Sequence, residues 1–338
     1  MIRFAVIGTN WITEQLIQAA QRHPDFALTA VYSRTEAKAS EFAAKYDVKA
    51  IFTDLKAMAE SDAFDAVYIA SPNAYHAEQA ILLMDHGKHV LCEKPIASNA
   101  AELKAMIAAA QRNNVLLMEA LKSTLLPNFQ TVRDHLHKIG TIRRYVASYC
   151  QYSSRYDAYK QGTVLNAFNP IYSNGALMDL GVYCIYPLVV LFGKPNEVKA
   201  GGVLLSSGVD GEGSLIAKYD EMDAVIMYSK ITDSALPSEI QGELGTLVMD
   251  KISTPEKVEI RYRDGSVENI SRPQLDSKAH MFYEMEEFIR LLNSGQRESA
   301  VNSFANSSAV MDMMDEARRQ MGLVYPADLK TQGAMNDA

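Results

Sequence analysis

The first 120 residues alternate short apolar runs with amphipathic stretches, and this alternation limits the possible folds more than any other feature of the chain. Residues 2–7 and 26–32 are runs of strand formers. Between them, Gly8 precedes a helical spacing of apolar residues. Strand–helix–strand units of this length wind right-handed into a parallel sheet. The sequence therefore predicts an α/β domain at residues 1–120, built on a doubly wound parallel sheet.

Several loops follow predicted strands and should lie at one edge of that sheet. They contain Gly8, Ser33, residues 71–73 and residues 93–95. Ligands bind at the carboxyl ends of the strands in open α/β sheets. The segment Glu93-Lys94-Pro95 is the most informative, because packing alone poorly explains a lysine between an acid and a proline just past a buried strand. The Lys94–Pro95 bond is also a candidate cis peptide.

The turn after the first strand matches a dinucleotide-binding fingerprint only in part. Gly8-Thr9-Asn10-Trp11-Ile12-Thr13 supplies the first glycine of the G-x-G-x-x-G pattern. Asn10 tolerates left-handed backbone angles, and Thr13 is small enough for a close approach of helix and strand. Two interpretations stay open: a pyrophosphate at the helix N-terminus, or an ordinary turn with Asn10 as N-cap. Trp11 is expected to pack or to line a pocket.

The end of the second predicted strand indicates NADP(H) in preference to NAD(H). NAD-preferring domains place Asp or Glu there to bind the ribose 2′-hydroxyl. This chain instead has Ser33-Arg34-Thr35. Ser33 can donate a hydrogen bond to a 2′-phosphate, and Arg34 can bind it bidentately while stacking on adenine.

Beyond Leu121 the alternation stops, and stretches typical of a mostly antiparallel sheet take over. Strands are expected at 141–152, 196–205, 214–219, 224–231, 246–250 and 258–262, and helices at 276–292 and 303–321. We expect residues 121–326 to form a domain for substrate binding and dimerisation, with the option that its C-terminal helix packs back on the first domain. Residues 327–338 are expected to be a polar tail.

Taken together, these features resemble the Gfo/Idh/MocA family of oxidoreductases. The resemblance covers nearly the whole chain and rests on residues 71–76, Cys92-Glu93-Lys94-Pro95, the Gly-Ala-Leu-Met-Asp-Leu-Gly-Val-Tyr motif at 175–183, and residues 322–326. Tyr183 stands where many members have histidine, which is similar to the glucose-fructose oxidoreductase and dimeric dihydrodiol dehydrogenase branch. The resemblance implies an N-terminal Rossmann domain, a C-terminal open-sheet domain and hydride transfer.

Lys94, Asp179 and Tyr183 are the candidate catalytic residues. On a helix, Asp179 and Tyr183 would share a face one turn apart. A phenol titrates near ~10, and a nearby ammonium such as Lys94 favours the phenolate. The pair could take a carbinol proton while the hydride leaves for the nicotinamide. Asp179 would orient substrate hydroxyls and keep Lys94 charged. The alternative is that Tyr183 is a core tyrosine and Asp179 a surface acid.

The remaining candidates follow from position and from the resemblance. The cofactor-binding candidates are Gly8, Thr9, Asn10, Trp11, Ile12, Ser33, Arg34, Ser71, Pro72, Asn73, His76, Glu93 and Lys94, and the substrate candidates are Lys122, Arg155, Asn169, Asp179 and Tyr183. His76 could instead cap its helix, and Arg155 could form a surface salt bridge. No set of side chains has metal-ligand spacing, so no metal site is predicted.

Composition limits the kinds of partner that the chain can bind. A net charge of −8 argues against nucleic acid and anionic membranes. The apolar run at 180–192 is too short to span a bilayer and contains Pro187, so it predicts a buried helix. Three cysteines without metal spacing suit a cytoplasmic protein. A sheet with helices on one face favours a homodimer or a dimer of dimers, although charges such as Lys218 and Lys230 oppose burial of its other face.

The sequence thus predicts an NADP-dependent dehydrogenase or reductase acting on a sugar, a polyol or a vicinal diol. A cofactor-binding regulator without turnover is the first alternative, but it should have lost one of the three candidate catalytic residues. A redox-neutral lyase or glycosidase that recycles its NAD cofactor is the second. Its first hydride step would use the same residues.

Overall fold

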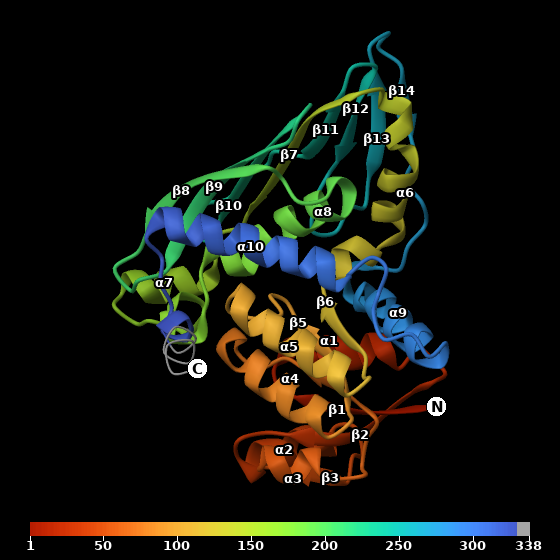
Figure 1. The fold of residues 1–338 in the computed structure, drawn as a ribbon, viewed down its shortest axis with the longest axis vertical. Helices are drawn as coiled ribbons and strands as arrows, with labels where there is room; N and C mark the ends of the chain where they lie inside the picture. The colour runs from red at the N-terminus through yellow and green to blue at the C-terminus, as the bar shows by residue number, and fades with distance from the viewer. Residues whose placement is uncertain (330–338) are drawn as a thin grey trace. The chain divides into compact units, whose positions relative to one another are not determined.

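The computed structural model describes residues 1–329, which divide into two compact units (Figure 1). Unit 1 consists of Met1–Lys122 and Leu275–Phe304. Unit 2 consists of Ser123–Gln274 and the residues from Ala305 onwards. The chain therefore crosses between the units three times.

Unit 1 is built on a six-stranded parallel sheet with the order β3-β2-β1-β4-β5-β6, which confirms the predicted doubly wound Rossmann architecture. Its strands are β1 (Ile2–Ile7), β2 (Phe26–Tyr32), β3 (Ala50–Phe52), β4 (Ala66–Ile69), β5 (His89–Glu93) and β6 (Leu117–Ala120). Its helices are α1 (Trp11–Ala20), α2 (Glu36–Ala44), α3 (Leu55–Ala59), α4 (His76–Asp85), α5 (Ala100–Arg112) and α9 (Met281–Asn293). The central strand β4 is buried along its whole length, as a strand covered on both faces must be.

Helix α9 completes unit 1 although it comes from far along the chain (Figure 1). The ring of Phe288 lies 5.9 Å from that of Phe4 on β1. The Asn293 amide donates to the Asp25 carboxylate over 3.0 Å. The sequence pattern predicted this amphipathic helix but assigned it to the second domain, because a hydrophobic stripe does not specify the surface that it will cover.

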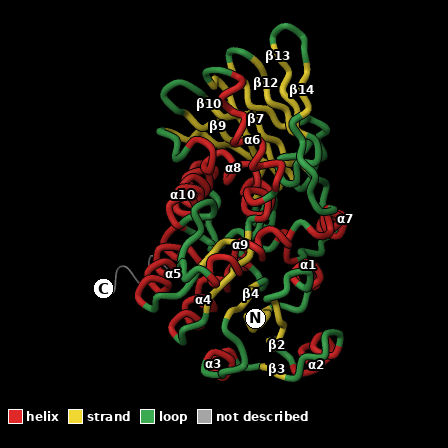
Figure 2. Tube along the Cα trace, turned by 90° about the vertical axis from the view of Figure 1, so that its right-hand side faces the viewer, coloured by secondary structure: helices red, strands yellow, loops and turns green. Residues whose placement is uncertain are grey.

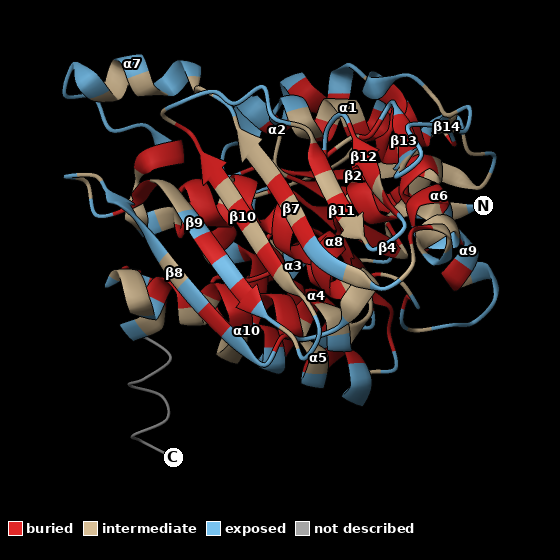
Figure 3. Cartoon of the chain, turned by 90° about the horizontal axis from the view of Figure 1, so that it is seen from above, coloured by how far each residue is buried: buried red, intermediate tan, exposed pale blue. Residues whose placement is uncertain are grey.

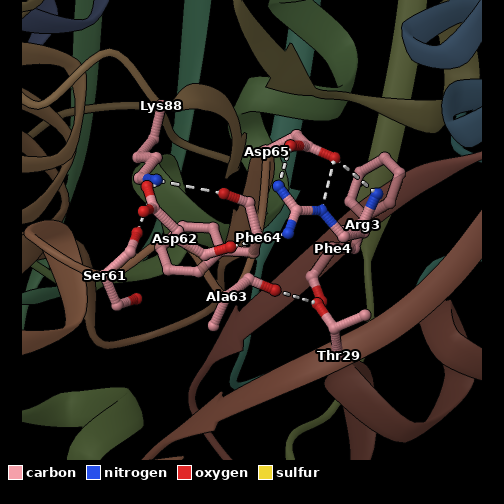
Figure 4. A network of polar contacts seen from close by, with 9 residues as sticks. All are labelled: Arg3, Phe4, Thr29, Ser61, Asp62, Ala63, Phe64, Asp65 and Lys88. Atoms are coloured by element: carbon pink, nitrogen blue, oxygen red, sulfur yellow. Dashed lines mark hydrogen bonds and ion pairs between the residues drawn. The ribbon is translucent and has the colours of Figure 1, made fainter.

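A polar network fixes the loop that leads into β4 (Figure 4). The guanidinium of Arg3 on β1 contacts the Asp65 carboxylate at 2.6 Å. Lys88 is buried, and its Nζ donates to the carbonyl oxygens of Ser61 (2.7 Å) and Phe64 (3.1 Å). Backbone carbonyls offset part of the cost of burying that ammonium. The network thereby ties the start of β4 to β1 on one side and to the start of β5 on the other.

Unit 2 is built on an eight-stranded sheet with the order β14-β13-β12-β11-β7-β10-β9-β8 (Figure 2, yellow). Only β7 and β10 pair in parallel, so the predicted mostly antiparallel sheet is confirmed. The strands are β7 (Ile142–Cys150), β8 (Glu197–Leu204), β9 (Asp210–Lys218), β10 (Asp223–Ser229), β11 (Ser238–Gly242), β12 (Gly245–Met249), β13 (Val258–Tyr262) and β14 (Val267–Asn269). Strands β11 and β14 were not predicted. The helices are α6 (Pro127–His135), α7 (Ser154–Lys160), α8 (Val182–Phe192) and α10 (Phe304–Met321).

The two faces of this sheet differ in exposure. Figure 3 shows buried and exposed bands alternating along β9, where Leu215 and Ala217 are buried and Ile216 between them is 43% exposed. On the buried face, the hydroxyl of Tyr145 on β7 donates to the carbonyl oxygen of Cys184 on α8 over 2.9 Å. Helix α8 therefore covers the face opposite to the one on which Ile216 and Val203 are exposed.

Among residues 1–329, one helical stretch, Pro170–Phe192, is long and apolar enough to cross a membrane by length and composition. In this structure 72% of its most apolar window is buried within the protein. Most of this stretch thus lies in the core of the protein, in line with the predicted buried helix at 180–192.

The C-terminal residues described by the structure are packed. Ala327 is buried, and the Asp328 carboxylate lies 2.7 Å from Nη1 of the buried Arg318. Arg318 also lies over the ring of Tyr325. Ala327 and Asp328 are therefore packed, whereas Leu329 is exposed, and the rest of the expected tail, 330–338, lies outside the described residues.

A buried acid on α9 predicts how stability depends on pH. Glu284 is buried, and within residues 1–329 neither of its carboxyl oxygens has a hydrogen-bond partner. Burial raises the pKa of Glu284 well above its usual value, and the nearby Glu93 carboxylate adds to the effect while Lys122 opposes it. The folded protein therefore keeps a proton that the unfolded chain releases, so the free energy of unfolding should fall as pH rises above the ordinary glutamate pKa.

Glu284→Gln should flatten this pH dependence, because the amide cannot ionise. Urea unfolding at about pH 5 and about pH 8 would measure it. From the lower to the higher pH, the free energy of unfolding of the variant should rise by about 1–3 kcal/mol relative to that of wild type. This is the scale for an unsatisfied buried group. Glu286→Gln is the control, since Glu286 is exposed on the same helix. Equal pH dependence in wild type and Glu284→Gln would contradict the prediction.

Candidate active site

The turn between β1 and α1 is held by Asn10 and requires glycine at position 8. The Asn10 Oδ1 accepts from the N–H groups of Ile12 (3.1 Å) and Thr13 (3.2 Å), and its Nδ2 donates to the Ala70 carbonyl oxygen (3.0 Å). Gly8 has a φ of +103°, and a Cβ there would lie 2.6 Å from that same carbonyl oxygen. Asn10 is thus the N-cap of α1, one of the two interpretations of the sequence, and it also ties this turn to the end of β4.

The other residues near this turn differ in exposure. Trp11 is 60% exposed at the first position of α1, so it does not pack in the core, and the other part of the expectation, that it lines a pocket, stays a prediction. Position 11 lies outside the stripe of α1 that faces the sheet, which starts at Thr13. Thr9 is half-buried. After β2, Ser33 is buried and its N–H donates to the Phe52 carbonyl oxygen (3.2 Å), whereas Arg34 is exposed.

His76 links two of the loops at the carboxyl ends of the strands. Its ring is buried, with Nδ1 3.0 Å from the Pro95 carbonyl oxygen and Nε2 2.8 Å from the Ser71 carbonyl oxygen. Burial lowers the pKa of His76, and the charge of Lys94 adds to this. The Ser71 hydroxyl donates to Gln79 Oε1 over 2.7 Å. His76 therefore holds the loop that contains Pro72 and Asn73 beside the Glu93-Lys94-Pro95 loop, where the Lys94–Pro95 peptide is cis as predicted.

Glu93 positions the backbone of Lys94. Its buried carboxylate accepts from the Tyr68 hydroxyl and, through Oε2, from the Lys94 N–H (3.2 Å). Burial raises the pKa of Glu93, while the charge of Lys94, the Tyr68 hydrogen bond and the charge of Lys122 lower it. Lys94 is half-buried at the end of β5, and Lys122 is half-buried at the last residue of this part of unit 1. Glu284 is a further ionisable side chain in this group. Sequence reasoning missed it, since its sequence context is an ordinary amphipathic helix.

In unit 2, Asp179 and Tyr183 lie on one continuous helix. Its first turn, Leu177–Gly181, is π-helical, and α8 continues it. The expectation of regular α-helical spacing is therefore wrong for this turn, and short π-helical segments are frequent at functional sites. Tyr183 is half-buried, and its ring packs edge-on against Tyr149 at 5.6 Å. It is not the fully buried core tyrosine of the alternative interpretation.

The buried carboxylate of Asp210 anchors the start of this helix. It accepts from the N–H groups of Ala176 (3.1 Å) and Leu177 (2.7 Å). Burial raises the pKa of Asp210 to about 6, against the lowering effect of these hydrogen bonds. Gly175 precedes the helix with a φ of +147°, and a Cβ at this position would collide with the Asp210 carboxylate. Sequence reasoning missed Asp210, because the helix start lies more than thirty residues away from it.

An ion pair within unit 2 joins Asp179 to Lys230. The Lys230 Nζ lies 2.8 Å from Asp179 Oδ2 and donates to the Ala167 carbonyl oxygen at 3.2 Å. It also lies 5.4 Å from the centre of the Phe168 ring. The sequence predicts Lys230 to be an exposed charge that opposes dimerisation, and this prediction is wrong. Lys218 is exposed in this way, but Lys230 follows the end of β10 and is buried.

The other substrate candidates are less constrained. Arg155 is exposed on α7. Asn169 is half-buried, and its Oδ1 accepts from the Ile171 N–H over 3.1 Å. The described contacts join Asp179 to the turn just before Asn169 through Lys230, but they do not include Arg155. Lys94 belongs to unit 1, whereas Asp179 and Tyr183 belong to unit 2.

Neither metal binding nor thiol chemistry is indicated by the described residues. Within residues 1–329 no group of three or more His, Cys, Asp or Glu side chains could hold a metal ion. Cys92 and Cys184 are buried and Cys150 is half-buried, each as a free thiol. Burial raises the pKa of all three, which disfavours the reactive thiolate.

Comparison with known proteins places these features in a family. Residues 2–121 match the oxidoreductase family with an NAD-binding Rossmann fold, GFO_IDH_MocA, and residues 129–248 match the GFO/IDH/MocA C-terminal domain. The chain is 62% identical over 328 residues to scyllo-inositol 2-dehydrogenase (NADP(+)) IolU of Bacillus subtilis (strain 168), covering 97% of this chain and 99% of the relative. It is 30% identical to trans-1,2-dihydrobenzene-1,2-diol dehydrogenase of Xenopus laevis, covering 96% and 99%.

A solved structure agrees with both matches. KijD10, a 3-ketoreductase from Actinomadura kijaniata in complex with NADP and TDP-benzene, superposes with a TM-score of 0.84 at 25% identity, covering 95% of this chain and 98% of that one. The two matched domains correspond to the parallel sheet of unit 1 and to most of the mixed sheet of unit 2. This chain belongs to the Gfo/Idh/MocA family of oxidoreductases.

Proposed function

We propose that this protein is an NADP-dependent dehydrogenase that oxidises a secondary hydroxyl of a cyclic polyol, with scyllo-inositol as its substrate. The observation that carries the proposal is the 62% identity, over 97% of the chain, to a scyllo-inositol 2-dehydrogenase that uses NADP(+). The presence of Lys94, Asp179 and Tyr183 argues against a regulator without turnover. It does not bear on the lyase or glycosidase alternative, which would show no net change in cofactor.

Unit 1 has the features that NADP(H) requires. Gly8 keeps the β1–α1 turn against the end of β4, and this supports the approach of a pyrophosphate to the N-terminal end of α1 beside the Asn10 cap. Arg34 is exposed just past β2, where no carboxylate would repel a 2′-phosphate. When bound, the nicotinamide supplies the acceptor for the hydride. The loops that contain Ser71–Asn73 and Glu93–Pro95 belong to the same edge of the sheet.

The protein's side chains then handle the proton. Lys94 stabilises the developing negative charge on the carbinol oxygen, and Tyr183 takes the hydroxyl proton as the hydride departs. Asp179 accepts hydrogen bonds from neighbouring substrate hydroxyls and so orients the carbon that is oxidised. In the reverse direction Tyr183 returns the proton to the ketone oxygen. Each role is a proposal for this chain.

Initial rates with scyllo-inositol, myo-inositol, glucose and a vicinal dihydrodiol, each with NADP⁺ and NAD⁺, test the proposal. Absorbance of the reduced cofactor measures turnover. We expect the highest kcat/KM with scyllo-inositol and NADP⁺. Equal or better efficiency with NAD⁺ would contradict the cofactor assignment, and absence of turnover with every substrate would contradict the activity.

Arg34→Ala should weaken NADPH binding selectively. Loss of a charge-assisted hydrogen bond to the 2′-phosphate should cost about 1–3 kcal/mol. NADH lacks that phosphate and serves as the matched control ligand. Titrating both cofactors by fluorescence would show a large change in Kd for NADPH and little for NADH. A parallel loss for both would mean that Arg34 supports the fold of the turn and does not read the phosphate.

Tyr183→Phe should separate the two possible proton carriers. It removes only the hydroxyl, so turnover should fall by roughly 10²–10⁴-fold with little change in cofactor affinity. Lys94→Ala should reduce both turnover and cofactor affinity, and Asp179→Asn should mainly raise the substrate KM. Single-turnover rates with a deuterated substrate isolate the chemical step. If Tyr183→Phe keeps more than about a tenth of the wild-type chemical rate, Lys94 carries the proton.

We also propose a homodimer, or a dimer of dimers, formed through the uncovered face of the unit 2 sheet. Val203, Leu204 and Ile216 are exposed on β8 and β9 and support this proposal. The burial of Lys230 removes one of the charges expected to oppose it. Light scattering should give at least twice the monomer mass at micromolar concentration, and a monomer would contradict the proposal. The three free thiols suit a cytoplasmic location.

A further inference from the structure

Lys230 forms an ion pair in which the two partners differ sharply in exposure. Its side chain is 4% exposed, whereas that of Asp179, 2.8 Å away, is 37% exposed. The Lys230 side chain therefore has little contact with solvent, whereas the Asp179 side chain has much more. A ligand that binds at this helix can therefore contact Asp179. Lys230 is too buried to contact that ligand and can act only through Asp179.

Stability alone is a poor explanation for this arrangement. Burying an ammonium carries a desolvation cost that one ion pair often does not recover. Packing would be served as well by a methionine, which has a similar shape and no charge. The charge of Lys230 is better explained by an effect on its neighbours. Those neighbours are Asp179, the Ala167 carbonyl oxygen, the Phe168 ring and, electrostatically, Asp210.

These contacts join two segments that are predicted to meet the substrate. Asp179 lies on the helix that also carries Tyr183, and Ala167 and Phe168 form the turn that leads into Asn169. One Nζ holds both. Asp210 fixes the start of the helix by accepting hydrogen bonds from the helix backbone. Two independent contacts, those of Asp210 and of Lys230, therefore fix the position of the Asp179 carboxylate.

We propose that Lys230 is a positioning residue that keeps Asp179 ionised and in a single orientation, so that the part-exposed carboxylate accepts hydrogen bonds from adjacent hydroxyls of the polyol. This inference rests on the proposed function. Lys230 acts through Asp179 and takes no part in hydride or proton transfer. Lys230 therefore contributes to substrate binding. It also stabilises the geometry of the 166–168 turn through the Ala167 carbonyl oxygen.

The test is steady-state kinetics of Lys230→Met with scyllo-inositol and NADP⁺. KM for the polyol should rise about 10–100-fold, the range of a charge-assisted hydrogen bond, while kcat falls less than about fivefold. NADPH affinity, read by fluorescence, should not change. Lys251→Met is the control, because Lys251 is an exposed lysine of the same unit. An unchanged KM in Lys230→Met would overturn the proposal.

Two further variants separate charge from packing. Lys230→Gln keeps a donor for the Ala167 carbonyl oxygen but carries no charge, so it should raise KM as Lys230→Met does; wild-type KM in a folded Lys230→Gln would overturn the proposal. It also serves as the test if Lys230→Met does not fold. In a double-mutant cycle, Lys230→Met should add less than about threefold to KM when Asp179→Asn is already present. A full additive loss would show that Lys230 does not act through Asp179.

The outcomes also distinguish this inference from the proposed function. If the wild-type protein does not oxidise any polyol, the proposed function fails before the variants are made. If the wild type is active and Lys230→Met, Lys230→Gln and Lys251→Met all behave like it, the function stands and the role of Lys230 fails.

Discussion

The hydrogen bonds between the Asp210 carboxylate and the amides of Ala176 and Leu177 are the constraint on which the candidate site in unit 2 depends. They fix where the helix begins and therefore where Asp179 and Tyr183 lie along it. The carboxylate is buried, so it is retained only because two amides satisfy it. Glycine at position 175 is a consequence of this contact, since any side chain there would occupy the space of the carboxylate.

In unit 1, too, a buried carboxylate fixes the backbone at a candidate catalytic residue, Lys94. Glu93 is buried, accepts from the Tyr68 hydroxyl and accepts from the amide of Lys94. In both units a buried acid fixes the backbone, and the neighbouring side chain is left accessible for chemistry. The cost of burying each carboxylate is offset locally by donors that the fold supplies. Precision at the site thus comes from groups that do not take part in the proposed reaction.

Sequence reasoning succeeded where the determining pattern is local. The strand–helix alternation and the Glu93-Lys94-Pro95 loop depend on residues close together in the chain, and both were predicted. The Asn10 cap is equally local and was one of the two interpretations left open. It failed where the determinant is a distant contact. Lys230 was assigned to the wrong environment, because residue 230 acquires its carboxylate partner only when β10 is placed beside the π-helical turn. For Trp11 only the option of packing in the core is excluded, because the residue stands at an exposed helix position.

The placement of α9 has a consequence for how the chain is made. Phe4 and its neighbours on β1 pack against Phe288, so the surface formed by the first strand is completed by residues synthesised near the end of the chain. As domains generally fold as units during synthesis, unit 1 cannot finish folding on the ribosome until all of unit 2 except its final segment has emerged. All eight strands of the mixed sheet are therefore available before unit 1, although first in sequence, receives the helix that completes it.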